Sequence, residues 1–247
     1  MKVTFLGTSH GRPEADRHCS ATMLELENGD AYLVDTGAPI ADMVYQLGKQ
    51  IEKLKGVFIT HLHSDHLDGI FCLLTLVTTR YNMAFDIILP GTEVYEHIKR
   101  YVELTCKINF PSDKIRFIEP SEGRVFEGKD ITVDYFETKH IPPEKTYGMV
   151  IKAEGKTLVF SGDMSGGLKG DDFPKYALEN PTDFIVCEMA HFTFSDLAPY
   201  IKRVNTKTFC INHINRAEKY SSVSVANESG EYDFPIIAVK DADEFKI

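Results

Sequence analysis

The chain of 247 residues lacks an overall excess of basic residues. Its 27 Lys and Arg are outnumbered by 37 Asp and Glu, which gives a formal net charge of −10. Non-specific binding to nucleic acid depends on clustered Lys and Arg that contact phosphates, so this balance argues against that class of protein. A local basic patch remains compatible with the total.

Long apolar runs are also missing. The longest, near residues 70–77, is far shorter than the roughly 20 residues that a membrane-spanning helix needs. The apolar stretch after Lys2 is interrupted at Thr4 and ends at Gly7, which is too short for the apolar region of a secretory signal. We therefore expect a cytoplasmic protein with no membrane partner.

Cysteine pairs are absent as well. The five cysteines are an odd number, and none of them has Cys-x-x-Cys spacing. This usage favours reduced thiols over a disulfide framework. Three of them lie in apolar runs and are predicted to pack in the core, namely Cys72, Cys187 and Cys210.

The apolar residues that are present follow two spacings. Alternation predicts strands over 21–27 and 31–34, joined in a hairpin by the Asn-Gly-Asp turn at 28–30. Apolar residues three or four apart predict helices over 40–54 and 67–81. The other predicted segments are strands over 3–6, 57–60, 86–89, 115–118, 131–137, 147–153, 157–160, 184–187, 208–211 and 235–239, and helices over 92–101 (capped by Thr92) and 196–203.

The same order of predicted elements, hairpins interleaved with helices, occurs twice along the chain. This order predicts an α/β fold with two mixed sheets that face each other and carry helices outside, a four-layer αββα sandwich. Because the sequence has no low-complexity linker and no charge block, we expect a single domain over 1–247. Its two similar halves would cover about 1–123 and 124–247.

The densest chemical signal is the stretch His61-Leu62-His63-Ser64-Asp65-His66, which follows the apolar residues 57–59. Neutral imidazole suits zinc and its first-row neighbours, and the added carboxylate suits a hydrolytic site better than a closed structural one. The alternative interpretation is a solvated turn that is rich in histidine. The His-x-His-x-Asp-His spacing favours metal binding.

Further candidate side chains follow other predicted strands. His140, Asp163, Glu188 and His213 each come after an apolar run, and Asp35 follows the strand 31–34. In open α/β sheets, functional groups gather at the carboxyl ends of strands, where the loops converge. A single histidine at a strand end is weak evidence, whereas several such positions together predict a site.

Seven of these side chains are candidate metal ligands: His61, His63, Asp65, His66, His140, Asp163 and His213. They are too many for one catalytic zinc, which has three protein ligands. They suit two metal ions that share one bridging carboxylate, with a water between the ions. Such a pair of ions stabilises the attacking and leaving oxygens of a displacement, so the expected chemistry is hydrolysis.

These motifs resemble the metallo-β-lactamase superfamily. The resemblance rests on the stretch from Thr60 to Gly69 and on the later ligands His140, Asp163 and His213. It covers nearly the whole chain, from Phe5-Leu6-Gly7-Thr8 through the segment Leu33 to Gly37 to His213. Within the superfamily the chain is most similar to the ribonuclease Z and phosphodiesterase branch. The motifs for that branch are Gly7-Thr8, Ser161-Gly162-Asp163, Val186-Cys187-Glu188-Met189-Ala190 and Asn212-His213-Ile214-Asn215-Arg216.

The resemblance implies two zinc ions, with manganese or iron as other candidate metals. It assigns His61, His63 and His140 to the first ion, Asp65, His66 and His213 to the second, and Asp163 to both as the bridge. It also implies that Asp35 accepts a hydrogen bond that orients a ligand imidazole. The alternative for Asp35 is a turn carboxylate that binds local backbone amides.

The resemblance further implies catalytic roles for Asp65, Glu188 and His191. Glu188 and His191 are similar to the Glu and His that position a proton for the leaving oxygen in ribonuclease Z. In that family a longer insert separates the two residues, whereas here only Met189 and Ala190 lie between them. A surface histidine is therefore the alternative interpretation of His191.

The function that these features predict is phosphodiester hydrolysis by a hydroxide that bridges the two metals. The chain has no long Gly-rich or basic insert of the kind with which ribonuclease Z holds tRNA, so a small phosphodiester and RNA are both candidate substrates. Hydrolysis of a thioester, lactone or sulfate ester is an alternative, and the resemblance suggests a homodimer. A non-catalytic scaffold and a diiron redox protein are further alternatives, although diiron relatives usually carry Glu in the place of His63.

Overall fold

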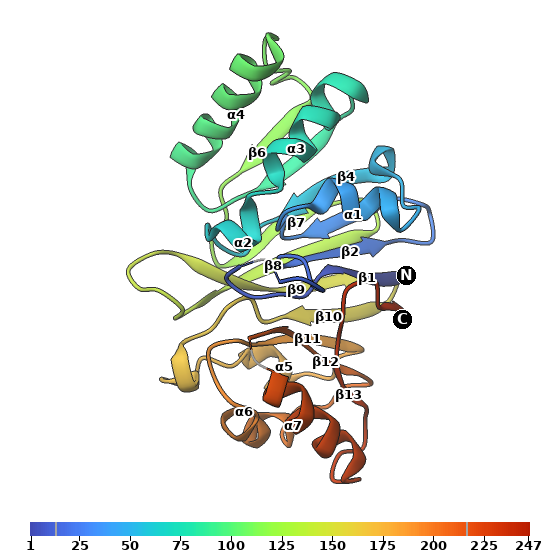
Figure 1. The fold of residues 1–247 in the computed structure, drawn as a ribbon, viewed down its shortest axis with the longest axis vertical. Coiled ribbons are helices and arrows are strands. Elements are labelled where there is room, and N and C mark those ends of the chain that lie inside the picture. The colour runs from blue at the N-terminus through green and yellow to red at the C-terminus, as the bar shows by residue number, and fades with distance from the viewer. Residues whose placement is uncertain (13, 216) are drawn as a thin grey trace. The chain divides into compact units, whose positions relative to one another are not determined.

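The computed structural model describes residues 1–12, 14–215 and 217–247 (Figure 1). Arg216, the last residue of one motif quoted above, lies outside them. Contacts divide the chain into two compact units. The first unit comprises Met1–Gly7, Gly11–Pro120 and Asp241–Lys246, and the second comprises Thr8–His10, Ser121–Lys240 and Ile247. Each unit has its own sheet and its own apolar core.

The first unit is built on a seven-stranded mixed sheet in the order β14-β1-β2-β3-β4-β5-β6. Pairing is antiparallel from β14 to β3 and parallel from β3 to β6, so the carboxyl ends of the parallel strands lie at one edge. The strands are β1 (Lys2–Gly7), β2 (Ala21–Glu25), β3 (Ala31–Val34), β4 (Leu54–Phe58), β5 (Phe85–Ile88), β6 (Ile115–Ile118) and β14 (Glu244–Lys246). The predicted bounds of β3 and β6 are confirmed.

Helices pack on this sheet and on each other, with α1 against β1 and α3, and α3 against α4 (Figure 1). They are α1 (Ile40–Gln46), η1 (Ile51–Lys53), α2 (Ser64–Leu67), α3 (Ile70–Thr75), η2 (Leu76–Arg80) and α4 (Thr92–Cys106). The prediction of one helix over 40–54 is wrong. Gly48 has a φ of 67°, which ends the helix, and Leu54 already begins β4.

Two other predictions for this unit need correction. The segment 67–81 is three short helical elements rather than one, because the chain first closes a turn around the histidines. Thr92 does not cap α4: its hydroxyl donates to the Glu119 carboxylate at 2.6 Å, and Gly91 occupies the cap position with a φ of 121°. Glycine adopts this backbone conformation without the steric cost that a Cβ would bring.

The second unit contains another seven-stranded mixed sheet, in the order β13-β12-β11-β10-β9-β8-β7. Pairing is antiparallel from β7 to β10 and parallel from β10 to β13. The strands are β7 (Gly123–Glu127), β8 (Ile131–Thr138), β9 (Thr146–Ala153), β10 (Lys156–Phe160), β11 (Phe184–Met189), β12 (Phe209–Ile214) and β13 (Ile236–Ala238). Two mixed sheets with helices confirm the predicted fold class.

Helix α7 packs on β12 and β13, and α6 contacts both α7 and η3 (Figure 1). The helices of this unit are η3 (Gly166–Leu168), α5 (Lys175–Glu179), α6 (Phe194–Ile201) and α7 (Ala217–Glu228). The sequence did not predict α5, α7, β7 or β14. In α7 the buried residues are Val223 and Ala226, so the apolar periodicity that reveals a helix is weak there.

The five cysteines, all within the described residues, form no disulfide. Cys187 and Cys210 are buried, as predicted, but Cys72 is exposed, so its predicted core position is wrong. On α3 the core positions are taken by Ile70, Leu73 and Leu74, which turn Cys72 to the opposite side of the helix.

Among the described residues, no helix has the length and apolar character to cross a bilayer.

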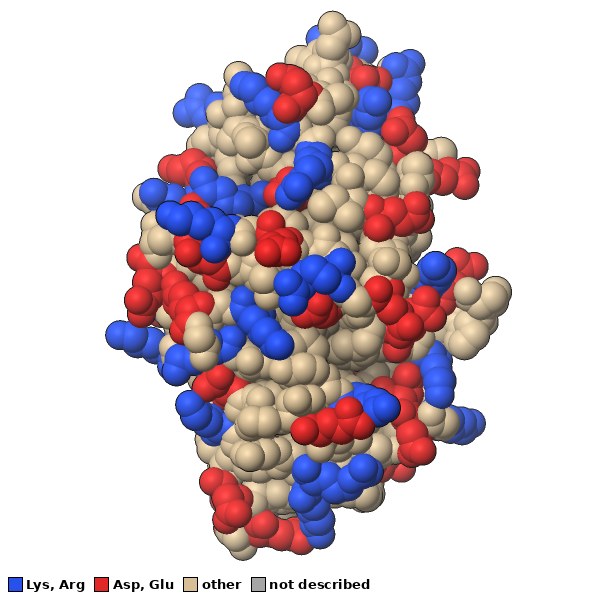
Figure 2. Space-filling view, turned by 180° about the vertical axis from the view of Figure 1, so that it is seen from behind, with Lys and Arg blue, Asp and Glu red and all other residues tan. Residues whose placement is uncertain are grey.

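Surface charges are paired locally. Arg116 donates to Asp86 at 2.7 and 2.9 Å, Arg100 lies 3.4 Å from Glu103, and Lys99 lies near Glu96 on the same helix turn. On the face drawn in Figure 2, blue Lys and Arg are interspersed with red Asp and Glu. The basic residues of α4 and β6 therefore lie in mixed-charge surroundings, as expected for a solvated face.

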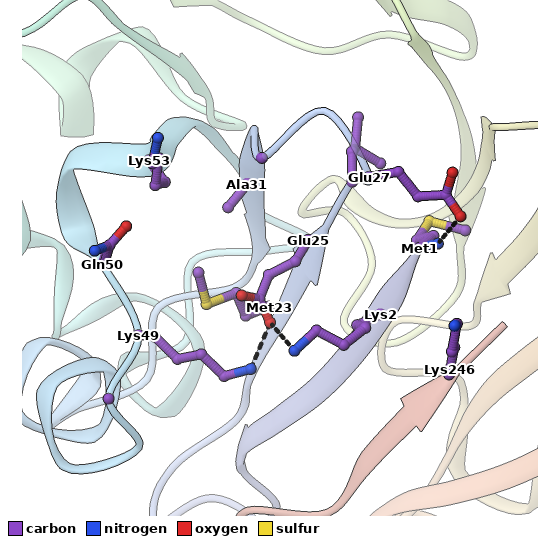
Figure 3. Close-up of a pocket in the computed structure, with 13 residues that line it drawn as sticks. Met1, Lys2, Met23, Glu25, Glu27, Ala31, Lys49, Gln50, Lys53 and Lys246 are labelled. Atoms are coloured by element: carbon purple, nitrogen blue, oxygen red, sulfur yellow. Dashed lines mark hydrogen bonds and ion pairs between the residues drawn. The ribbon is translucent and has the colours of Figure 1, made fainter.

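The first unit contains a cluster of four charged residues, and three of them, Lys2, Glu25 and Lys49, border a hollow of about 450 Å³. Figure 3 shows Glu25 between Lys2 and Lys49, whose Nζ atoms lie 3.6 and 2.5 Å from its Oε2. Glu244 bonds the same two lysines at 3.2 and 2.5 Å. The hollow lies where β1 and β3 begin, whereas the candidate ligands follow strand carboxyl ends. This cluster connects β14, β1, β2 and the turn after α1.

The cluster predicts a pH-dependent contribution of Glu244 to stability. Its hydrogen bond from Lys49, with that from Lys2, lowers the pKa of Glu244 from 4.5 to about 2. A carboxyl with a lowered pKa stabilises the fold above its ordinary pKa, and this contribution is lost as the pH falls from 4.5 towards 2. We expect Glu244→Gln to lower the urea midpoint slightly at pH 7, and the difference from wild type to shrink below pH 4.5. Glu27→Gln serves as the control, and a pH-independent difference would contradict the prediction.

Candidate metal centre

The first unit brings together the four candidate ligands of the histidine-rich turn. His61 follows β4, His63 is the residue that precedes α2, and Asp65 and His66 lie within α2. The His61 ring centroid lies 4.7 Å from that of His63 and 4.2 Å from that of His66. The Asp65 carboxylate lies 3.5 Å from His66 Nε2 and accepts the Gly11 amide proton at 2.7 Å. Three of the four residues, all except His63, are buried.

Asp35 connects to two of these histidines from the end of β3. Its Oδ2 lies 2.8 Å from His66 Nδ1, and its Oδ1 accepts the Thr60 amide proton at 2.8 Å. The Thr60 hydroxyl donates to the same carboxylate and lies 3.0 Å from His61 Nδ1. Asp35 is 4 % exposed, so these bonds are shielded from competing water. It therefore orients His66 directly and His61 through Thr60.

Asp35→Asn is expected to weaken metal binding by about 10- to 100-fold, the usual cost of losing a partner that orients a ligand. The neutral amide accepts hydrogen bonds with one oxygen only, so the donors of His66 and Thr60 can no longer all be satisfied. Competition with a chromogenic chelator measures the affinity. Asp42→Asn, on the exposed side of α1, is the control. Equal metal affinity in wild type and Asp35→Asn would contradict this role.

The backbone after Asp35 holds the turn in place. The Thr36 amide donates to the His66 carbonyl at 2.7 Å, and the Thr36 carbonyl accepts the Gly69 amide proton at 2.8 Å. A Cβ on Gly37 would lie only 2.4 Å from the Asp65 carbonyl oxygen. The close approach of these two segments therefore requires glycine at position 37.

The second unit brings together the other three candidate ligands. Asp163 follows β10, and its Oδ2 lies 3.3 Å from His213 Nε2 and 3.8 Å from His140 Nε2. All three residues come from strand ends at one edge, because β8, β10 and β12 run in the same direction. The Asp163 carboxylate therefore lies close to both imidazoles.

His213 owes its orientation to a β-bulge. Glu188 pairs with Asn212 and Met189 with Ile214, so His213 is the extra residue on β12. It has a φ of 54°, and its Nδ1 lies 2.9 Å from the Ser9 carbonyl oxygen. A bulge turns a side chain out of the regular alternation of a strand, and bulges are frequent next to active sites.

The hydrogen bonds of the imidazoles fit a metal site. In His61, His66, His140 and His213 the Nδ1 atom lies within 3.3 Å of an oxygen, which for His140 is the Met164 carbonyl. When Nδ1 donates to oxygen, the lone pair of Nε2 is left for a metal ion. Buried imidazoles with carboxylates are also the donor set that zinc, manganese and iron bind. The residues present therefore suit the expected ions.

Glu188 and His191 lie next to these ligands in the second unit. His191 Nδ1 is 2.8 Å from Glu188 Oε2 and 2.9 Å from Oε1, and its ring centroid is 4.5 Å from that of His140. Glu188 is buried, whereas the His191 side chain is 31 % exposed. The shorter spacing between them thus still permits direct contact, and solvent reaches the imidazole.

Sequence reasoning missed several groups that orient the ligands. They are the Thr60 hydroxyl, the carbonyls of Ser9 and Met164, and the Asp172 carboxylate. Thr60 was part of the motif, so its position beside His61 was a usable signal. Carbonyl partners leave no trace in a sequence, and Asp171-Asp172 has the composition of an exposed turn.

Comparisons with known proteins show which family the chain belongs to. A family model described as Anti-Pycsar protein Apyc1 matches residues 1–234. A ribonuclease Z of Prochlorococcus marinus (strain MIT 9215) is 29 % identical over 184 residues, which cover 72 % of this chain. The chain spans only 57 % of that relative's length.

Solved structures show the same fold. The short form of human tRNase Z matches with a TM-score of 0.77 and 20 % identity, over 100 % of this chain and 99 % of that one. The metallo-β-lactamase fold protein YhfI from Bacillus subtilis matches with a TM-score of 0.77 and 16 % identity, over 99 % of both chains. The predicted resemblance to the metallo-β-lactamase superfamily, near ribonuclease Z, is confirmed. The family match covers nearly the whole chain, so this protein belongs to the family described as Anti-Pycsar protein Apyc1 and has the metallo-β-lactamase fold.

Proposed function

We propose that the protein is a metal-dependent phosphodiesterase with a dinuclear centre. Its candidate ligands are His61, His63, Asp65, His66, His140, Asp163 and His213. The observation that carries the proposal is the orientation of four imidazoles by oxygen partners at Nδ1, which leaves Nε2 available to metal. Relatives named ribonuclease Z support phosphodiester hydrolysis as the reaction.

The number of ligands supports two ions rather than one. A single catalytic zinc takes three protein ligands, and seven candidates exceed that number. Asp163, whose Oδ2 lies between two imidazole Nε2 atoms, is the candidate bridge. When bound, two ions would activate a water for attack on phosphorus and neutralise charge on the phosphate oxygens. Zinc is the first candidate, with manganese and iron as alternatives.

Glu188 and His191 would together supply a proton to the leaving oxygen. Glu188 accepts a hydrogen bond from His191 Nδ1 and so orients the imidazole. Nε2 of His191, whose side chain is partly exposed, would then donate a proton to the departing alkoxide. This arrangement resembles the carboxylate–imidazole pair that orients a general acid or base in hydrolases.

His191→Gln is expected to lower kcat by about 10²- to 10⁴-fold, the usual contribution of a positioned acid. The loss should be smaller for a substrate such as bis(p-nitrophenyl) phosphate, whose leaving group needs no proton. A merely structural role would reduce turnover of both kinds of substrate equally. Comparing kcat for an activated and an unactivated phosphodiester therefore tests the assignment, with His97→Gln on α4 as the control.

Two observations favour a small phosphodiester as the substrate. Several basic residues are paired with carboxylates, including Arg116 with Asp86 and Lys207 with Asp183. Basic and acidic side chains are also interspersed on the face in Figure 2. Binding the body of a tRNA would need a continuous basic surface. RNA is the second candidate, because the named relatives are ribonuclease Z.

The deciding experiment is a substrate panel on metal-loaded protein. It compares bis(p-nitrophenyl) phosphate, a cyclic mononucleotide and a precursor tRNA, with thioester, lactone and sulfate-ester substrates in parallel. The proposal expects turnover of phosphodiesters, with the small substrates preferred over tRNA. Activity confined to another ester class would replace the phosphodiesterase assignment. Stoichiometric metal binding without turnover of any substrate would favour a non-catalytic role.

A further inference from the structure

Two loops of the second unit carry the candidate ligands His140 and Asp163 and the Met164 carbonyl. Lys139 and His140 follow β8, and the loop after β10 contains Asp163, Met164 and Ser165. His140 Nδ1 lies 3.3 Å from the Met164 carbonyl oxygen, which is one direct connection between the loops. That bond is longer than most N–H···O bonds, so by itself it holds the two ligands only loosely relative to each other.

Asp172 makes a second connection between the same loops. Its two carboxylate oxygens each lie 2.9 Å from the Lys139 amide nitrogen, and its Oδ2 accepts the Ser165 amide proton at 2.7 Å. The first amide precedes His140 by one residue, and the second follows Asp163 by two. Together with the bond from His140 Nδ1 to Met164, these contacts close a ring of hydrogen bonds around both ligand loops.

The environment of Asp172 makes these bonds strong. The residue is 7 % exposed, and hydrogen bonds from amides to a carboxylate are shorter and about twice as strong as those between neutral groups. Lys139 Nζ also donates to the Gly170 carbonyl at 2.5 Å, which connects Lys139 to the loop that carries Asp172. A buried carboxylate that loses its hydrogen-bond donors is destabilised, so the two amides and Asp172 stabilise one another's positions.

Glu188 holds the same loop from its other side. Its Oε1 accepts the Met164 amide proton at 2.7 Å, while Asp172 holds the next amide, that of Ser165. Two buried carboxylates thus fix consecutive amides directly after Asp163. Glu188 also contacts His191, whereas the described bonds of Asp172 go to backbone amides of the ligand loops.

We propose that Asp172 is a positioning residue that sets the distance between the metal ligands His140 and Asp163. It is not one of the candidate metal ligands, and it would act through the backbone of the two loops. The inference rests on the proposed metal centre. Loss of Asp172 should therefore weaken metal binding by about 10- to 100-fold, as for other groups that orient ligands.

The test compares Asp172→Asn with the matched control Asp171→Asn. Asp171 is the adjacent exposed residue, and its Oδ1 accepts a hydrogen bond from the Tyr200 hydroxyl at 3.1 Å. Zinc affinity is measured by chelator competition, and the melting temperature of the metal-free protein is measured in parallel. We expect Asp172→Asn to bind zinc about 10- to 100-fold more weakly and Asp171→Asn to bind it like wild type. Zinc affinity unchanged in Asp172→Asn, with only the metal-free melting temperature lowered, overturns the inference.

A measurement on the wild-type protein covers the case in which Asp172→Asn does not fold. Hydrogen exchange at the amides of Lys139 and Ser165 should slow when zinc is added, because metal binding and the Asp172 bonds stabilise the same loop arrangement. Exchange rates that do not change with zinc would overturn the inference while leaving the metal centre intact. If wild-type protein binds no zinc, the proposed centre fails, and the role of Asp172 fails with it.

Discussion

Replacing His63 with alanine is expected to reduce phosphodiester turnover on the order of 10³-fold or more. His63 belongs to the histidine-rich turn, and its ring lies 4.7 Å from that of His61. Without it, the proposed first ion loses one of its imidazole ligands and with it the geometry that activates water. The fold should persist, because the side chain lies at the start of α2 rather than in the apolar core of the first unit.

The measurement is kcat together with metal content, with far-UV circular dichroism as the check of folding. His97→Ala is the matched control, since His97 is an exposed histidine of α4 whose Nδ1 lies 3.0 Å from the Glu93 carbonyl. Wild-type turnover in His63→Ala would contradict its assignment as a ligand. A loss of turnover with a full complement of metal would instead assign His63 to substrate binding.

Removing the metal is expected to abolish activity completely and reversibly. The candidate ligands include buried side chains such as His61 and Asp163, which a bound cation would stabilise. Dialysis against a chelator should therefore lower the melting temperature as well as turnover. With free zinc at 100 times its dissociation constant, each site would stabilise the fold by about 2.7 kcal/mol.

Titration of the metal-free protein with zinc, manganese and ferrous iron measures both effects. Activity should recover fully at two equivalents of metal per chain, and the ion that restores the highest kcat identifies the preferred metal. Full recovery at one equivalent would argue for a mononuclear site. Turnover that survives complete metal removal would contradict the proposed mechanism.

Much of the fold follows from local sequence patterns. The hairpin of β2 and β3 was predicted from alternation and an Asn-Gly-Asp turn, both of which are properties of adjacent residues. The helix predicted over 40–54 was too long, because its apolar spacing continues past Gly48 into a residue that belongs to β4. Periodicity shows which residues are apolar, whereas packing decides whether they continue a helix or begin a strand.

The sequence alone determined the candidate ligands of the site. The spacing of His61 to His66 and the position of polar residues after apolar strands are local features, and parallel strands bring such residues to one edge of a sheet. The orientation of those ligands was decided only by the tertiary structure. The bulge at His213 depends on pairing between β11 and β12, and the burial of Asp172 depends on two loops that are more than 20 residues apart. Contacts between distant segments leave no periodic signal in a sequence, so the groups that hold the ligands become visible only once the chain has folded.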